Sequence, residues 1–337
     1  MTRRIVAAVA LLAAGCTSSS TVASHSTSGG ATRATHPASR SAHAPVVTAL
    51  HVSTVMHLPV GVSRTVVVAD GGSLVVLGGL AAGDTTTARV WVVDPRRHRA
   101  RAAGSLTQAS HDASGAFLDG SADVFAGGAA TTLTAVQAWR AGHTRVIGSL
   151  PSPRSDSAAA VIGNTAYVVG GFDGHAMTRD VLATADGHRW RVVARLRVGV
   201  RYPAVAAIGA AVYVVGGALA TTEGTASGPQ TAAVQRVDVR TGRVTIVGHL
   251  SRPLAHATAF SVGGRLFVAG GRHGATPTSA VSVVDLGTGH EHEVARLPVA
   301  LSDAGVAVTG STAWLVGGET AGPGAPVSTI YALTASA

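Results

Sequence analysis

Polar side chains that could bind or act on a ligand stand at one recurring place, just before stretches of small residues. The group combines arginine and histidine, which hold carboxylates or transfer protons, with aspartate, which can act as a base. Its members are Arg64, His111, Asp112, Arg154, Asp156, Arg201, Tyr202, His256 and Asp303. If the stretches converge, these side chains form one polar site. Alternatively they cap strand starts and pair with one another, with Arg154 and Asp156 as a plausible pair.

A second polar group follows paired glycines. The candidates for binding there are Asp173, His175, Arg272 and His273, and Asp84, Phe172, Arg179, Glu223 and Glu319 stand in the same loops. The segment 218–233 is the longest of these loops. Long loops on a rigid scaffold often carry recognition, although a tolerated insertion explains the length equally well.

The sequence contains no strong metal-binding or catalytic motif. His290 and His292 alternate with Glu291 and Glu293, so the two histidines could share one face of a strand. A solvent-facing polar edge is the preferred interpretation. The sequence contains no HExxH, P-loop or nucleophile-elbow pattern in the context that each requires. We therefore predict no catalytic residue, no metal site and no cofactor.

An internal repeat positions these residues. A run of apolar or β-branched residues ending in Gly-Gly occurs six times, with the first glycines 43 to 54 residues apart. The glycine pairs are Gly78-Gly79, Gly127-Gly128, Gly170-Gly171, Gly216-Gly217, Gly270-Gly271 and Gly317-Gly318. A small-residue strand and a turn precede each pair, and a polar loop and two further strands follow it. Each unit is thus predicted to hold four short strands.

The repeat resembles the Kelch motif in its paired glycines, in the aromatic residue that often starts the strand before them, and in endings such as Leu150-Pro151. The resemblance covers about residues 50–337 and implies an all-β, six-bladed β-propeller. After the sixth glycine pair only the strand 327–334 remains, and residues 51–58 match a fourth strand. We therefore expect the N-terminal strand to close the ring on the C-terminal blade, which protects sheet edges.

The resemblance also frames the function. Ligands of such propellers usually sit where the loops before the first strand and after the second strand share one face. We expect a binding or scaffolding protein for a glycan, a peptide or an envelope protein. The alternative is a sialic-acid mutarotase-like enzyme that uses Arg64, Arg154, Arg201, His256 and Asp303. The copper oxidases of the family need a cysteine inside the domain, and the chain's single cysteine, Cys16, lies outside it.

The N-terminus reads as an export signal. Residues 1–15 have a basic start, a short apolar run and small residues before Cys16, which resembles a bacterial lipobox. We predict a lipidated Cys16, a flexible tether over residues 16–45 and the propeller over residues 46–337. The protein is then anchored outside the cytoplasm on the bacterial cell membrane, or alternatively secreted, by the Sec or the twin-arginine route.

The positive net charge does not indicate nucleic-acid binding. The formal charge is +9, and Arg3, Arg4, Arg33 and Arg40 lie in the first 45 residues. Removing these four leaves 22 basic residues against 17 acidic ones. The cluster from Arg96 to Arg101 has no interleaved aromatic platform. The uncharged stretch 204–220 is long enough to suggest a membrane helix, but it aligns with two strands of the neighbouring repeats.

Overall fold

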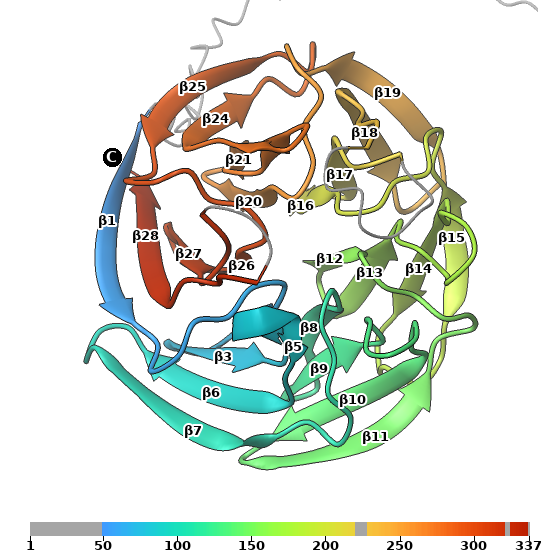
Figure 1. The fold of residues 1–337 in the computed structure, drawn as a ribbon. Helices are drawn as coiled ribbons and strands as arrows, with labels where there is room; N and C mark the ends of the chain where they lie inside the picture. The colour runs from blue at the N-terminus through green and yellow to red at the C-terminus, as the bar shows by residue number, and fades with distance from the viewer. Residues whose placement is uncertain (1–48, 220–227, 321–323, 336–337) are drawn as a thin grey trace, which may run out of the picture. The chain divides into compact units, whose positions relative to one another are not determined.

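The computed structural model describes residues 49–219, 228–320 and 324–335 (Figure 1). The predicted signal segment 1–15, Cys16 and the tether 16–45 lie outside the described residues. Within them, the chain forms six four-stranded antiparallel sheets arranged around a central axis as the blades of a propeller. The prediction of an all-β, six-bladed propeller is confirmed.

The blades follow one another along the chain. Blade 1 contains β2 (Val66–Asp70), β3 (Ser73–Leu77), β6 (Arg89–Asp94) and β7 (Arg99–Ser105). Blade 2 contains β8 (Ser114–Leu118), β9 (Ser121–Phe125), β10 (Ala135–Arg140) and β11 (His143–Ser149). Blade 3 contains β12 (Ala158–Ile162), β13 (Thr165–Val169), β14 (Asp180–Thr184) and β15 (Arg191–Arg195).

The second half of the ring repeats this order. Blade 4 contains β16 (Ala204–Ile208), β17 (Ala211–Val215), β18 (Ala233–Asp238) and β19 (Val244–His249). Blade 5 contains β20 (Thr258–Val262), β21 (Arg265–Ala269), β24 (Ala280–Val284) and β25 (Glu291–Arg296). Blade 6 contains β26 (Gly305–Thr309), β27 (Thr312–Val316), β28 (Thr329–Ala335) and β1 (Leu50–His57).

Short elements complete the loops after the second strands. Blade 1 adds β4 (Leu80–Ala81), the 3₁₀ turn η1 (Ala82–Asp84) and β5 (Thr85–Thr86), and blade 5 adds β22 (Arg272–His273) and β23 (Thr276–Pro277). No helix of the described segments is long and apolar enough to cross a bilayer. The stretch 204–220 begins with the paired strands β16 and β17, as predicted.

The ring closes through blade 6. β1 pairs antiparallel with β28 from Leu50 opposite Ala335 to His57 opposite Thr329 (Figure 1). The predicted closure of the N-terminal strand on the C-terminal blade is therefore confirmed. Because β1 and β28 come from the two ends of the domain, the last blade forms only when most of the chain is in place.

The core lies between the blades. Each of six apolar clusters joins two neighbouring sheets, and every inner strand contacts the next one around the axis. Inner strands are rich in small residues because six of them meet at the axis. At Gly115, an added Cβ would lie 2.3 Å from a methyl carbon of Val66 in the neighbouring inner strand. Most of the apolar side chains are thus buried in contacts between neighbouring sheets.

Paired glycines hold neighbouring blades together. The second glycine donates its N–H to a carbonyl of the next blade's loop, as from Gly79 to Ser110 (2.8 Å) and from Gly318 to Val62 (2.9 Å). The first glycine packs against that same carbonyl. At Gly317, where φ is +66°, an added Cβ would lie 1.9 Å from the Val62 oxygen. A side chain at Gly317 would therefore collide with the backbone of the next loop, which accounts for the first glycine of this pair.

Blade 2 departs from the predicted alignment by one residue. Ala126, with φ +57°, takes the position of the first glycine, and Gly127 takes that of the second, donating to the Arg154 carbonyl at 2.8 Å. The alignment of Gly127-Gly128 with the other pairs was therefore wrong. Gly128 instead forms the β-bridge with His111 that matches the bridge from Leu80 to Ser63.

Candidate functional site

Six residues, one from each loop that leads into a blade's first strand, form a ring around the axis. This axial ring consists of Arg64, Asp112, Asp156, Tyr202, His256 and Asp303, all with φ between +49° and +58°. Each residue accepts a backbone hydrogen bond from the next member, and Arg64 closes the circuit by donating to the Asp303 carbonyl (2.8 Å). The six loops are thereby linked into one framework.

The left-handed backbone of the ring is unusual for residues with side chains. Each such residue adds a local cost of about 1–2 kcal/mol, although aspartate and histidine tolerate it better than most. Strain that repeats at six equivalent positions persists because the surrounding hydrogen bonds impose it. Its effect is to gather six side chains at one mouth of the central channel.

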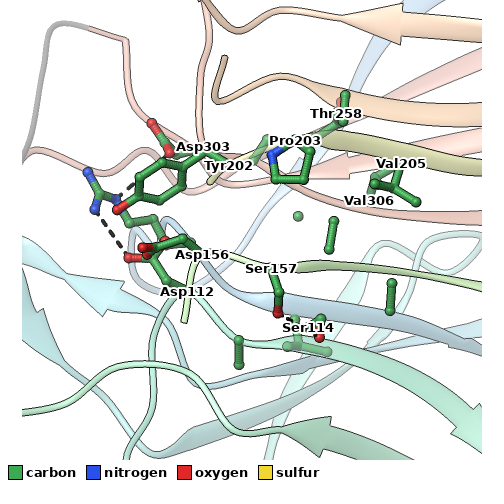
Figure 2. A pocket seen from close by; sticks show the side chains of 18 of the residues that line it. Asp112, Ser114, Asp156, Ser157, Tyr202, Pro203, Val205, Thr258, Asp303 and Val306 are labelled. Carbon is green, nitrogen blue, oxygen red and sulfur yellow. Dashed lines mark hydrogen bonds and ion pairs between the residues drawn. The ribbon is translucent and has the colours of Figure 1, made fainter. Parts of the chain in front are cut away.

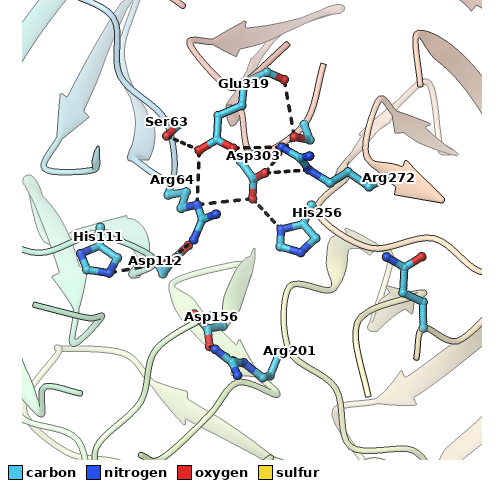
Figure 3. Close-up of polar contacts among 12 residues, drawn as sticks. Ser63, Arg64, His111, Asp112, Asp156, Arg201, His256, Arg272, Asp303 and Glu319 are labelled. Atoms are coloured by element: carbon cyan, nitrogen blue, oxygen red, sulfur yellow. Dashed lines mark hydrogen bonds and ion pairs between the residues drawn. The ribbon is translucent and has the colours of Figure 1, made fainter. Parts of the chain in front are cut away.

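Arg64 and Arg272 hold the acidic side of this mouth (Figure 3). The Arg64 guanidinium donates to Asp112 (3.2 Å) and lies within 3.8 Å of Asp303 and 3.5 Å of Glu319. Arg272 donates to Glu319 (3.0 Å) and lies 3.6 Å from Asp303. Glu319 is fully buried, so its charge depends on these two partners.

A histidine–aspartate pair lies beside this network. His256 Nδ1 is 2.7 Å from Asp303 Oδ1, and Ser302 donates to the other carboxylate oxygen at 2.8 Å. Because an ionised carboxylate only accepts, Nδ1 carries the proton of this hydrogen bond. The imidazole stacks on the Tyr202 ring with centroids 4.0 Å apart. The pair is fixed in place and resembles the orienting half of an acid–base centre.

Arg201 and Asp156 form the remaining ion pair. Arg201 Nε donates to Asp156 at 2.6 Å, and the guanidinium lies over the Phe172 ring at 4.4 Å and near the Tyr202 ring at 5.3 Å. Both charged side chains are buried. Arg201 therefore acts as a fixed cation between two aromatic rings.

These surroundings shift several ionisation equilibria. Burial is the main cause that raises the pKa of Asp112 to about 8; Arg64 opposes the shift, and Asp156 and Asp303 add to it. Burial likewise raises the pKa of Glu319, and it raises that of Tyr202 well above its usual value. Burial also disfavours the charge on Asp303, but His256 and Arg64 outweigh it and hold the pKa of Asp303 well below its usual range.

Behind the ring, the channel encloses a small cavity. Its volume is about 160 Å³, and the ring residues and the first residues of the inner strands line it. Figure 2 shows Asp112, Asp156, Tyr202 and Asp303 gathered at one end, with Ser114, Ser157, Val205 and Val306 farther along. A cavity of this size admits several water molecules or a small polar group of a ligand held at the mouth.

Most of the predicted site residues meet at this mouth. The structure brings together Arg64, Asp112, Asp156, Arg201, Tyr202, His256, Asp303 and Arg272, and His111 lies beside Asp112 with its Nε2 3.8 Å from the carboxylate. Both predicted loop groups therefore contribute to the site. In each blade, the residue that immediately precedes the ring residue forms a β-bridge with a residue of the loop that follows the second strand.

Arg154, Asp173, His175 and His273 are not part of this network. Arg154 is buried inside blade 3, where its guanidinium donates to the carbonyls of Gly170 and Asp180. The suggested Arg154–Asp156 pair was wrong, since Asp156 pairs with Arg201. Asp173 accepts the backbone N–H groups of His175 and Ala176 in its own loop, and His273 Nδ1 contacts the Pro253 carbonyl at 2.7 Å.

Two residues of the network were missed. Ser63 donates to Glu319 at 2.9 Å, and Ser302 bonds Asp303. Each immediately precedes a ring residue in the sequence. Aligning the six loops of the sequence identifies the position before each ring residue in every repeat. The alignment does not show that serines at this position bond the buried carboxylates.

Asp112 gives the site a pH signature. With its pKa at about 8 in the folded state and near 4 in the unfolded state, the folded state binds more protons between these values. The free energy of unfolding should therefore fall as pH rises from 5 to 8, by at most about 1.4 kcal/mol per pH unit from this group. Asp112→Asn, which tolerates the same backbone, should flatten the profile in urea unfolding. Parallel profiles for both proteins would contradict this.

The geometry defines the class of the protein. A family model described as the Kelch motif matches residues 153–183, which contain β12, β13 and most of β14. Together with the six-bladed fold, this match supports a β-propeller built of Kelch-type repeats.

Among solved structures, the chain is similar to one titled "Structure of YjhT", with a TM-score of 0.70 and 16% identity, over 84% of this chain and 97% of that one. No curated protein sequence matches the chain. At this identity the likeness to YjhT shows the fold alone.

Proposed function

We propose that the protein is a non-enzymatic binding propeller of the bacterial cell envelope, tethered through a lipidated Cys16. It recognises a glycan, a peptide or another envelope protein at the axial mouth. The Kelch-type fold supports a binding or scaffolding role, since its loops present side chains from all six blades on one face. The sequence around Cys16 supports the anchor.

The mutual pairing of the mouth's charges carries this proposal. Each of the three arginines has a carboxylate within ion-pair distance: Asp303 lies near both Arg64 and Arg272, and Asp156 pairs with Arg201. An anionic ligand would have to displace a carboxylate from one of them, which costs several kcal/mol for buried groups. A neutral polar group, such as a hydroxyl or an amide, fits the fixed donors and acceptors around Tyr202 and His256 without that cost.

The same pairing weighs against a sialic-acid mutarotase, which needs arginines free to hold the substrate carboxylate. One observation favours that alternative: the His256–Asp303 pair, at 2.7 Å, is suited to moving a proton. Both functions place His256 at the ligand, and they differ in whether the bound compound reacts.

The test uses the purified full chain on a glycan array and a peptide array. We expect binding by the wild type and a loss of at least about tenfold in His256→Asn, which keeps a left-handed backbone and a donor toward Asp303. His290→Asn, at an exposed turn of blade 5, is the matched control. No binding, or equal binding by both variants, would refute recognition at the mouth.

Two further measurements separate the remaining parts. Anomerically pure N-acetylneuraminic acid followed by NMR should mutarotate at its spontaneous rate, and acceleration lost in His256→Asn would establish the alternative. Cell fractionation should find the wild type in the membrane fraction and Cys16→Ser outside it. Equal distribution of the two would exclude the anchor.

A further inference from the structure

Two glutamine side chains clamp loops to blades. In blade 2, the Gln137 side-chain oxygen accepts the Gln108 N–H at 2.8 Å, and its amide nitrogen donates to the Gln108 carbonyl at 2.9 Å. In blade 4, Gln235 makes the same two bonds to Val198, both at 3.0 Å. Each clamp joins the third strand to the loop that leads into the blade.

Trp91 occupies the clamp position in blade 1. The alignment follows from backbone bonds, since Arg89, Ala135 and Ala233 each accept the N–H of the residue at the first-glycine position. Two residues after them stand Trp91, Gln137 and Gln235. The loop residue that corresponds to Gln108 and Val198 is Val60, two residues after a buried leucine.

A pocket lies at the seam between blades 6 and 1, beside the unclamped Val60. Its volume is about 570 Å³, and Val60, Thr86, Arg89, Trp91 and Pro326 are among the residues that line it. In the described parts of the chain, neither the N–H nor the carbonyl of Val60 has a hydrogen-bond partner. Blade 5 is similar, because Ser282 stands at its clamp position and a cavity of about 380 Å³ opens beside it.

The lining of the seam pocket specifies a ligand. Among the described residues, no carboxylate lies within 4.0 Å of the Arg89 guanidinium, unlike the arginines of the axial mouth. Trp91 is half-buried and adds an apolar surface to the same pocket that Arg89 and Val60 line. A volume in this range and a mainly apolar lining with few polar groups are typical of sites for small ligands or short peptide segments.

We propose that the seam pocket binds an acidic peptide segment through the primary carboxamide of an asparagine or glutamine side chain. The carboxamide bonds the Val60 N–H and carbonyl, as Gln137 and Gln235 do in their own blades. A neighbouring carboxylate of the peptide pairs with Arg89, and aliphatic carbons pack on Trp91. A trans secondary amide, such as an N-acetyl group, is unsuitable because its N–H and carbonyl point in opposite directions and cannot both reach one residue.

The test titrates the full chain with acetyl-Glu-Gln-Glu-N-methylamide and follows the Val60 amide and Trp91 indole signals by NMR. We expect saturable shifts at both, and affinity at least about tenfold weaker for acetyl-Glu-Met-Glu-N-methylamide, which keeps charge and size but lacks the carboxamide. Arg89→Ala, an exposed site, should also weaken binding about fivefold or more without changing thermal unfolding.

Trp91→Gln provides the decisive variant, because it supplies an internal carboxamide to Val60 and should abolish peptide binding. Its loss of apolar packing is checked by thermal unfolding, and Arg89→Ala keeps the proposal testable if that variant is unstable. Equal affinity for the two peptides, or no shift at about 10 mM peptide, would overturn the proposal.

Discussion

Arg272→Met is expected to lower the free energy of unfolding by about 3–5 kcal/mol, because it leaves buried carboxylates without their partner. Arg272 donates to Glu319, which has no solvent exposure, and lies 3.6 Å from Asp303. Methionine replaces the aliphatic part of the arginine side chain, so the change removes the guanidinium and keeps most of the apolar packing. Urea unfolding at neutral pH measures the effect.

A surface pair supplies the matched control. Arg296 lies 2.7 Å from Glu293 with both side chains largely exposed, so Arg296→Met should cost less than about 1 kcal/mol. Adding Glu319→Gln to Arg272→Met should restore part of the loss, since it removes one of the stranded charges. Similar costs for the buried and the exposed arginine would contradict this view of the mouth.

Gly317→Ala should destabilise the fold by about 2–5 kcal/mol, which combines the cost of a left-handed alanine with that of forcing two blades apart. An added Cβ would lie 1.9 Å from the Val62 carbonyl oxygen, at the seam between blades 6 and 1. The neighbouring Gly318 donates to that same oxygen, so the collision also disturbs a bond between blades. Thermal and urea unfolding report the change.

Gly163→Ala separates the two contributions. Gly163 has φ +59°, but no atom lies within 4 Å of an added Cβ, so only the backbone cost of about 1–2 kcal/mol applies. Ala126 provides the reverse test, because Ala126→Gly relieves a left-handed alanine and should leave stability unchanged or slightly raised. If Gly163→Ala costs as much as Gly317→Ala, the close approach of the blades is not the reason for the paired glycines.

Sequence patterns were sufficient for the fold. The glycine pairs recur because blades pack at that point, and a repeated packing requirement leaves a repeated residue type. Blade 2 shows the limit of this logic. Ala126 occupies the first-glycine position there. Because Gly128 follows Gly127, the sequence shows a Gly-Gly pair one residue too late, and only the backbone hydrogen bonds give the correct alignment.

The candidate site was predictable as a place but not as a set of contacts. Six ring positions could be found because each precedes a small-residue strand. Which charges pair depends on side-chain direction, and Arg154 turned into its blade while Arg201 reached Asp156. The Gln137 and Gln235 clamps left no signal, since their partners are backbone groups that any residue supplies.

The path of β1 has a mechanical consequence. β1 begins with Leu50 at the face opposite the axial mouth and runs toward the mouth, antiparallel to β28. A pull on the Leu50 end of the strand, away from the mouth, therefore acts along the strand. All the hydrogen bonds between β1 and β28 then share the load in shear, whereas a pull across the strands would open them one at a time. The closure that completes the ring is thus oriented to withstand a pull along β1.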